Sequence, residues 1–322
     1  MCLSLKKKGL TKNLEENEKK VCVILGPTAT GKSDLSIWLA NKIKGEIVSA
    51  DSMQIYKEMD IATAKVSKEI RKKVPHHMLD FLEIDKNFSV AAYVKMSKKI
   101  IDEILKKNKK PILVGGTGLY IDSLLNGAQF NKNSTDENLK QQLKEELNTK
   151  GKEYMFFKLK ELDPNYAEKV HMNNTKRILR AIEKNNLTKK TIKENNNFKQ
   201  TFNSLKIGLN FKNRENLYEK INIRIDKMLE KGLLKEAKQI LFKKCSKTAK
   251  QAIGYKELEP YFLKQTSLEE AILKLKQNSR KYAKRQITWF KKDKEINWFF
   301  LDEEEKSSIK EKILELLKNF YN

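Results

Sequence analysis

The stretch GPTATGKS at residues 26–33 fits the phosphate-binding pattern G-x-x-x-x-G-K-[ST] at every position. The run VCVIL (21–25) leads into it, and SDLSIWLANKI (33–43) follows with a helical pattern. In this setting the backbone N–H groups of the turn and the positive end of the helix point at one anion. Lys32 would neutralise phosphate charge, and the Ser33 hydroxyl is a ligand for Mg²⁺. The stretch predicts a phosphate-binding loop (P-loop) and leaves open which phosphate it holds.

Short apolar runs alternate with helical patterns on either side of this loop. The runs typical of strands are EIVSA (46–50), MLDFL (78–82), PILVG (111–115), LKIGL (205–209) and INWFF (296–300). Residues 89–108, between two of them, carry apolar side chains at helical spacing. This alternation predicts an α/β fold, a P-loop NTPase-like, mostly parallel sheet flanked by helices.

The alternation stops after Phe130. Residues 131–203 show only helix-like periodicity and Asn-rich joints, and a strand pattern returns at Leu205. We therefore expect an all-helical domain at 131–203, inserted into a P-loop core made of 21–130 and 204–322. Residues 1–20, which lack an apolar signal core, are expected to form a flexible tail.

The charge of the chain points to a polyanionic partner. The net charge is +25, and between residues 274 and 294 nine residues are basic and one is acidic. On a helix, Lys276, Arg280 and Lys284 form one stripe, and an apolar stripe can face the core. Because no apolar run approaches the roughly 20 residues of a membrane span, no membrane role is expected. The pattern favours the phosphate backbone of structured RNA.

The three cysteines, Cys2, Cys22 and Cys245, lie far apart and form no C-x-x-C pair. Neither a disulfide framework nor a zinc site is predicted, which favours a reducing, cytoplasmic compartment.

A nucleotide hydrolase normally has an apolar strand that ends in a magnesium-binding Asp. The strand PILVG instead runs into Gly115, Gly116 and Thr117. Asp51 follows EIVSA, at the sheet edge where ligands of open α/β folds bind. We expect Asp51 to be a metal ligand or a general base, with a helix N-cap as the alternative. Thr117 would offer a hydroxyl to a ligand or belong to a plain tight turn.

Seven motifs, taken together and in order, resemble the tRNA dimethylallyltransferases, also called the tRNA isopentenyltransferase (IPP transferase) family. They span about residues 21–300 and are GPTATGKS, DSMQIYKEMDIATAK (51–65), PHHMLD (75–80), GGTGLYI (115–121), NNTKRILRAIE (173–183), QAIGYKEL (251–258) and RKYAKRQITWF (280–290).

The resemblance implies transfer of the dimethylallyl group from dimethylallyl diphosphate to N6 of the adenosine at tRNA position 37, beside the anticodon. The P-loop would then hold the diphosphate of a prenyl donor, in agreement with the missing Asp after PILVG. Mg²⁺ would be the cofactor and the tRNA anticodon stem-loop the macromolecular partner. The protein is expected to be a cytoplasmic monomer without a protein partner.

Site residues follow from the matching motif positions. The diphosphate loop would be Gly26, Pro27, Thr28, Ala29, Thr30, Gly31, Lys32 and Ser33, with Ser33 on Mg²⁺. The catalytic residues would be Asp51 (the base), Lys32, Thr117 and Arg224, which lies in INIRIDKMLEKGL. The tRNA contacts would be Asp51, Ser52, Met53, Gln54, Thr117, Lys140, Lys176, Arg177, Ile178, Leu179, Arg180, Gln251, Ala252, Ile253, Gly254, Tyr255 and Lys256.

Three departures from the family pattern stand out. Thr30 replaces the usual Ser and keeps the hydroxyl, and Ala62 replaces a frequent Gly. Lys140 stands where Arg is frequent, so one contact loses a bidentate fork.

Three other functions remain as alternatives. An adenylate isopentenyltransferase acting on free AMP or ATP would share the loop and Asp51, but it would need neither inserted helices nor a polybasic helix. A P-loop small-molecule kinase requires a magnesium Asp that the strands do not provide. A non-catalytic RNA-binding protein would leave Lys32 and Asp51 without a task.

Overall fold

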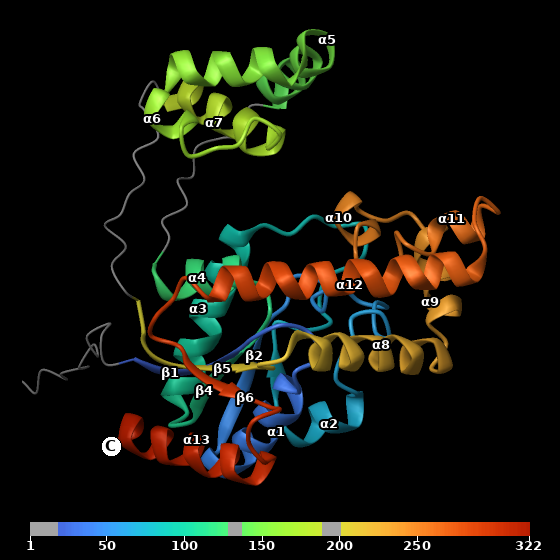
Figure 1. Ribbon diagram of the computed structural model, residues 1–322. Coiled ribbons are helices and arrows are strands. Elements are labelled where there is room, and N and C mark those ends of the chain that lie inside the picture. The colour runs from blue at the N-terminus through green and yellow to red at the C-terminus, as the bar shows by residue number, and fades with distance from the viewer. Residues whose placement is uncertain (1–18, 128–136, 189–200) are drawn as a thin grey trace, which may run out of the picture. The chain divides into compact units, whose positions relative to one another are not determined.

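The computed structural model describes residues 19–127, 137–188 and 201–322. Its sheet has six strands in the order β3-β2-β4-β1-β5-β6, and every strand pair is parallel (Figure 1). The strands are β1 (Lys20–Leu25), β2 (Gly45–Ala50), β3 (His76–His77), β4 (Lys110–Gly115), β5 (Asn203–Asn210) and β6 (Asn297–Phe300). The predicted α/β class with a parallel sheet is confirmed.

Helices cover both faces of the sheet, which explains why its strands read as continuous apolar runs. Val21, Val23 and Leu25 of β1 belong to the core formed with α3 (Val90–Lys106) and α4 (Gly118–Leu125). The alternate residues Cys22 and Ile24 belong to the core on the other face. That core includes side chains of α1 (Lys32–Ile43) and α13 (Lys306–Tyr321) (Figure 1).

A third apolar core holds the helices that follow β5. Leu217, Ile221 and Ile225 form a buried stripe on α8 (Arg214–Glu230), and Leu275 and Ala283 are buried on α12 (Leu268–Phe290). The same core includes side chains from α9 (Leu233–Leu241), α10 (Lys247–Lys250) and α11 (Glu259–Phe262). This core fixes the places of α8 and α12, both of which contribute to the site.

The strand predicted at MLDFL is wrong. β3 lies directly before this run, at His76–His77, and α2 (Lys68–Lys73) precedes β3. Met78 and Asp80 have φ values of 57° and 59°, left-handed conformations that end an extended run. Asp80 is held there by ion pairs with Lys65 and Arg71. The buried apolar residues Met78 and Leu79 thus lie in an irregular segment, whose following residues 80–82 bond to the backbone of Gln54 and Ile55.

The chain divides into two compact units, residues 129–198 and the remainder. The described part of the smaller unit contains α5 (Glu137–Leu162), which is kinked at Gly151, α6 (Pro164–Ala167) and α7 (Thr175–Thr188). It has its own core, to which Leu143, Met155 and Ile178 belong. Most of the tail predicted at 1–20 lies outside the described residues.

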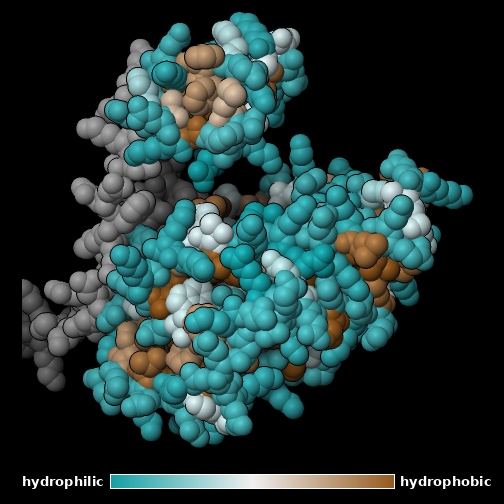
Figure 2. All heavy atoms as spheres, in the orientation of Figure 1, coloured by the Kyte–Doolittle hydropathy of each residue, from teal (hydrophilic) through white to brown (hydrophobic). Residues whose placement is uncertain are grey.

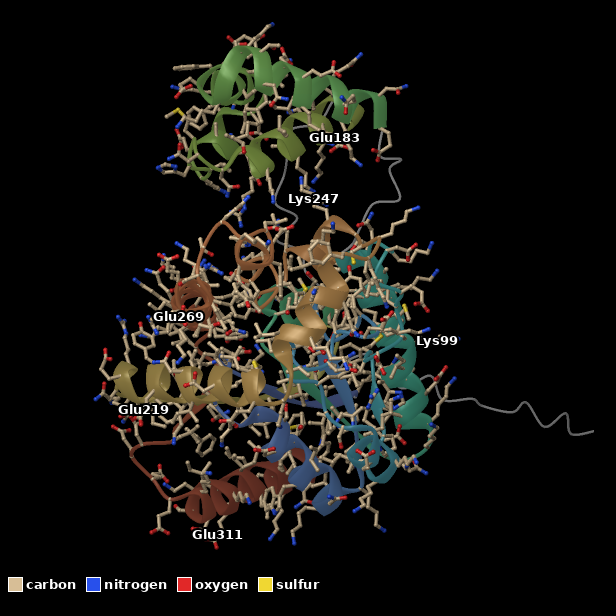
Figure 3. All side chains as sticks on the ribbon, turned by 90° about the vertical axis from the view of Figure 1, so that its right-hand side faces the viewer. Lys99, Glu183, Glu219, Lys247, Glu269 and Glu311 are labelled. Carbon is tan, nitrogen blue, oxygen red and sulfur yellow. The ribbon has the colours of Figure 1, made fainter. Side chains whose placement is uncertain are left out.

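Hydrophilic side chains cover most of the visible face (Figure 2). Lys99, Glu219 and Glu311 point away from the ribbon into solvent (Figure 3). Within the described ranges, each helix is too short or too polar to span a bilayer.

Candidate active site

The P-loop turns sharply after β1 and is held by short internal bonds. A Cβ at Gly26, which has φ 139°, would collide with the Leu209 carbonyl oxygen of the neighbouring strand, so the turn requires glycine. The Thr30 hydroxyl donates to the Pro27 carbonyl at 2.9 Å, and the Lys32 ammonium donates to the same oxygen at 2.6 Å. The loop is therefore preformed, with the N-terminus of α1 behind it.

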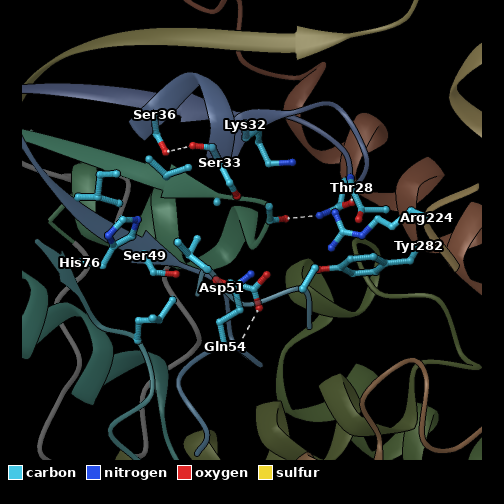
Figure 4. Close-up of a pocket in the computed structure, with 18 residues that line it drawn as sticks. Thr28, Lys32, Ser33, Ser36, Ser49, Asp51, Gln54, His76, Arg224 and Tyr282 are labelled. Carbon is cyan, nitrogen blue, oxygen red and sulfur yellow. Dashed lines mark hydrogen bonds between the residues drawn. The ribbon is translucent and has the colours of Figure 1, made fainter. Parts of the chain in front are cut away.

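A cavity of about 90 Å³, here called the P-loop pocket, opens in front of this loop. Lys32 and Ser33 come from α1, Asp51 from the end of β2, and Arg224 from α8 (Figure 4). The pocket thus collects two cations, a hydroxyl and a carboxylate at the carboxyl edge of the sheet. Such a set can bind an anionic group and still leave a proton acceptor beside it.

Lys32 carries a strongly shifted ammonium group. Although part of the residue is exposed, its ammonium reaches inward, where burial lowers its pKa to about 7. Arg224 contributes to this lowering of the pKa, and Asp51 opposes it. A bound polyanion would reverse the effect, because it supplies the negative charge that this site lacks.

Asp51 begins the turn after β2. Its Oδ1 accepts the N–H groups of Met53 (2.8 Å) and Gln54 (3.3 Å). The helix N-cap expected as the alternative is not found, because the next helix, α2, begins only at Lys68. Asp51 caps a turn instead, and it also lines the P-loop pocket. The turn orients the carboxylate, and Oδ2 takes no part in it.

Thr117 lies beside this turn, at the start of α4. Its hydroxyl accepts the N–H of Ser52 at 3.2 Å and is hydrogen-bonded to the Tyr282 hydroxyl. Tyr282 comes from α12 and points toward Asp51 (Figure 4). Burial raises the pKa of Tyr282, and Asp51 raises it further, so the group stays a neutral phenol. The sequence analysis did not assign Tyr282 to the site, although Tyr282 lies in the motif RKYAKRQITWF.

Gln286, also missed, connects two loops of the site from α12. Its side-chain oxygen accepts the Thr28 N–H at 2.9 Å, and its amide donates to the Gly116 carbonyl at 2.9 Å. The residue is buried. Because its partners lie far away in sequence, only the motif RKYAKRQITWF hinted at it.

A second cavity of about 240 Å³, the α8–α12 pocket, lies between those helices and the Asp51 turn. Apolar side chains such as Ile221, Ile225 and Leu275 form much of its wall. The predicted tRNA contacts that line this pocket are Asp51, Ser52, Met53, Gln251, Ala252, Ile253, Gly254 and Lys256. Gln54 lines the P-loop pocket instead, and Tyr255 is fully buried behind the wall.

The two pockets share four residues: Thr28, Asp51, Arg224 and Tyr282. A group held in one pocket can therefore reach a group held in the other at this junction. The P-loop side of the junction is polar and cationic, whereas the α8–α12 side is largely apolar. This arrangement suits the transfer of an apolar group from an anionic carrier.

A third cavity, the basic cleft, borders the P-loop on the side of α2 and α13. Its lining includes Lys68, Arg71, Lys220 and Lys227, and Arg224 lines it as well as the two other pockets. Positive charge of this kind attracts anionic small molecules toward the loop.

The remaining predicted contacts lie in the smaller unit. Lys140 is on α5 and pairs with Glu137 at 2.6 Å. On α7, Lys176, Arg177 and Arg180 are exposed, Leu179 is half-buried, and Ile178 is buried in the core of that unit. Three of the five α7 positions thus present charge to a partner.

The basic stripe on α12 is partly engaged within the fold. Lys276 pairs with Asp226 at 2.6 Å, and Arg280 donates to Asn222 at 2.8 Å, so both face α8. Lys284 and Arg285 are exposed, and Arg285 also lines the α8–α12 pocket. The charge offered to a polyanion on this helix is therefore smaller than its sequence indicates.

The described residues contain no group of three or more His, Cys, Asp or Glu side chains that could hold a metal ion. His76 lines the P-loop pocket but bonds to the Val74 carbonyl oxygen at 2.7 Å, and burial lowers its pKa. A metal in this site would need ligands from a bound substrate.

Known proteins are similar to this chain in sequence and in fold. Residues 54–293 match the family model for IPP transferase. The tRNA dimethylallyltransferase of Halothermothrix orenii is 46% identical over 315 residues, covering 96% of each chain. The tRNA isopentenylpyrophosphate transferase of Bacillus halodurans is similar in structure, with TM-score 0.69, 38% identity and coverage of 94% of this chain and 98% of that one.

A eukaryotic dimethylallyltransferase acting on tRNA is also similar, with TM-score 0.74 and 32% identity, covering 84% of this chain and 69% of that one. The resemblance inferred from the seven motifs is confirmed. Because the family model covers most of the chain and the relatives match it almost from end to end, the chain belongs to the IPP transferase family, that of the tRNA dimethylallyltransferases.

Proposed function

We propose that the protein transfers the dimethylallyl group from dimethylallyl diphosphate to N6 of the adenosine at position 37 of tRNA. The products are N6-(dimethylallyl)adenosine and diphosphate. The observation that carries this proposal is the junction at Thr28, Asp51, Arg224 and Tyr282, where a cationic pocket meets an apolar one. The relatives named above support it, since their names state dimethylallyl transfer to tRNA.

The diphosphate would bind in the P-loop pocket, on residues 26–33. Loop N–H groups, the N-terminus of α1, Lys32 and Arg224 are all positioned to stabilise negative charge. That charge grows on the diphosphate as the allylic C–O bond breaks. The loop is therefore assigned to leaving-group stabilisation.

Mg²⁺ fits this site only together with the substrate. Ser33 would supply one ligand and the diphosphate oxygens the others, in keeping with the preference of Mg²⁺ for few protein ligands plus phosphates. When bound, the ion would neutralise charge that develops on the leaving diphosphate. Lys32 and Arg224 act on the same oxygens.

The adenine would enter the α8–α12 pocket, after leaving the anticodon stack at a cost of about a few kcal/mol. Ser52, Met53 and residues 251–254 would contact it there. Asp51 would accept the proton of the exocyclic amine as the new C–N bond makes that amine acidic. Thr117, fixed by Ser52 and Tyr282, would contact the acceptor beside Asp51.

The tRNA would be held mainly by phosphate contacts. The residues offered for this are Lys140, Lys176, Arg177 and Arg180 of the inserted helical domain, and Lys256 of the core. We assign the inserted helical domain, which ends before β5 begins at Asn203, to tRNA binding, and the unit that holds the sheet to catalysis. As a tRNA-modifying enzyme the chain is expected to act in the cytoplasm, as a monomer.

Label transfer tests the reaction. Prenyl-labelled dimethylallyl diphosphate is incubated with Mg²⁺ and either an anticodon stem-loop carrying adenosine 37 or AMP, and the nucleosides are then identified by mass. We expect label on N6 of adenosine in the stem-loop. A variant stem-loop with guanosine at position 37 is the matched control and should stay unlabelled. Label on AMP alone would instead identify an adenylate isopentenyltransferase and overturn the proposal.

A further inference from the structure

The turn at residues 60–66, here called the partition loop, is a wall shared by the cavities of the site. Ala62 and Thr63 line the α8–α12 pocket. Ala64 and Val66 line both the P-loop pocket and the basic cleft. If this loop moved, the cavities that hold donor and acceptor would open into the cleft.

Glu236 of α9 holds the first half of the partition loop. It is buried, and its carboxylate accepts three consecutive backbone N–H groups, those of Asp60 (2.9 Å), Ile61 (2.7 Å) and Ala62 (2.9 Å). A buried carboxylate is costly unless donors surround it, and its hydrogen bonds are about twice as strong as those of a neutral acceptor. Glu236 therefore fixes the loop more firmly than a neutral side chain could.

The same carboxylate also holds a neighbouring part of the wall of the α8–α12 pocket. The Tyr255 hydroxyl donates to it at 2.8 Å, and burial followed by Glu236 raises the pKa of Tyr255, so the donor keeps its proton. Gly254, the preceding residue, packs so closely on the loop that an added Cβ would lie 3.0 Å from Ala62 Cβ. One buried group thus ties together two loops that meet at the pocket.

The partition loop is connected to the reacting centre through Gln54. The Gln54 side-chain amide donates to the Thr63 carbonyl at 3.0 Å, and its backbone N–H donates to Asp51 Oδ1 at 3.3 Å. We propose that Glu236 is a positioning residue that keeps the partition loop closed and so excludes water from the junction at Asp51. This inference rests on the proposed prenyl transfer.

The chemistry gives this role a specific readout. When the allylic C–O bond to the diphosphate breaks, the carbon can be captured by the adenine amine or by water. Capture by water forms a new C–O bond, releases one proton to solvent, and yields dimethylallyl alcohol and diphosphate. A closed partition loop favours the amine, and an open one raises the share of alcohol.

The test uses Glu236→Gln and Tyr255→Phe in the full chain, with labelled dimethylallyl diphosphate and the stem-loop. Prenylated RNA and dimethylallyl alcohol are quantified in the same samples. Glu236→Gln places an amide NH₂ against backbone donors and should lower the ratio of RNA product to alcohol at least about tenfold. Tyr255→Phe leaves the carboxylate and its three backbone bonds and should lower it about two- to threefold.

Glu219→Gln, an exposed glutamate on α8, is the matched control and should leave the ratio unchanged. Slower transfer with an unchanged product ratio in both variants would overturn the proposal, since Glu236 would then be only a stability element. If Glu236→Gln fails to fold, the ratio of RNA product to alcohol in Tyr255→Phe tests the proposal, and an unchanged ratio in that variant would overturn it. Absence of RNA labelling by the unaltered protein would instead refute the proposed function.

Discussion

The P-loop pocket and the α8–α12 pocket share a junction but are built in opposite ways. The first takes its cations and hydroxyls from residues next to strand ends, with Arg224 added from α8. The second consists largely of apolar side chains from two long helices and the loop at residues 251–254. In the proposed reaction, the first pocket would act by electrostatic stabilisation of the leaving diphosphate, and the second by matching the shape of the incoming adenine.

Apart from changes at Asp51, loss of Arg224 should have the largest effect on this comparison, because Arg224 lines both pockets and the basic cleft. Removing a preorganised charged donor typically costs about 10²- to 10³-fold in rate. We expect Arg224→Gln to lower kcat by that factor while the KM for the stem-loop changes less than about threefold. Steady-state kinetics with each substrate varied would check this. Arg214→Gln, exposed on the same helix, is the control.

The pH dependence of donor binding tests the electrostatic role proposed for the P-loop pocket. Since the pKa of Lys32 is lowered to about 7, the free enzyme loses this charge as pH rises through that value. Diphosphate binding favours the protonated form of Lys32. The KM for dimethylallyl diphosphate should therefore rise with pH, by at most about tenfold for each pH unit between about pH 7 and about pH 9. In Lys32→Met this rise should disappear. A KM in the unaltered protein that is flat over this range would contradict the assigned role.

A smaller effect is expected at Tyr282, where the pockets meet. Tyr282→Phe keeps the ring and removes the hydroxyl that holds Thr117. A lost hydrogen bond of about 1 kcal/mol corresponds to a fall of roughly fivefold, which we expect in kcat rather than in either KM. Tyr261→Phe, in the third core on α11, should change neither. An unaltered kcat in Tyr282→Phe would place the hydroxyl outside the reaction.

The smallest effect is predicted away from both pockets. Lys176→Ala should weaken stem-loop binding a few-fold and reduce the slope of log affinity against log salt by about one. Binding titrations over a range of salt concentrations would measure this. Lys99→Ala, an exposed lysine on α3, is the control. If Lys176→Ala and Lys99→Ala showed the same dependence of affinity on salt, Lys176 of α7 would not contact the RNA.

Sequence reasoning could predict the site residues that follow strand ends, but not those that helices contribute from far along the chain. The P-loop, Asp51 and Thr117 were predictable because each directly follows a buried strand, and parallel strands bring their carboxyl ends to one edge. Gln286 was not, since its partners lie 258 and 170 residues away. Glu236 and Tyr282 look like ordinary helix positions until the fold brings their partners to them.

The wrong strand at MLDFL has a local cause. Its apolar letters are those of a strand, but left-handed backbone at Met78 and Asp80 and the ion pairs of Asp80 bend the chain there. Apolar composition reports burial, whereas extended conformation also depends on such local bonds.

Single-turnover transfer by Asp51→Asn tests the central claim most directly. Asn keeps the side-chain oxygen that accepts the Met53 and Gln54 N–H groups, so the turn should persist. With binding of dimethylallyl diphosphate and stem-loop measured in the same samples, we expect affinities within about threefold of those of the unaltered protein. We expect transfer to be slowed by about 10³-fold or more. Transfer within about tenfold of the unaltered rate would contradict the assignment of Asp51 as the base at the junction of the two pockets.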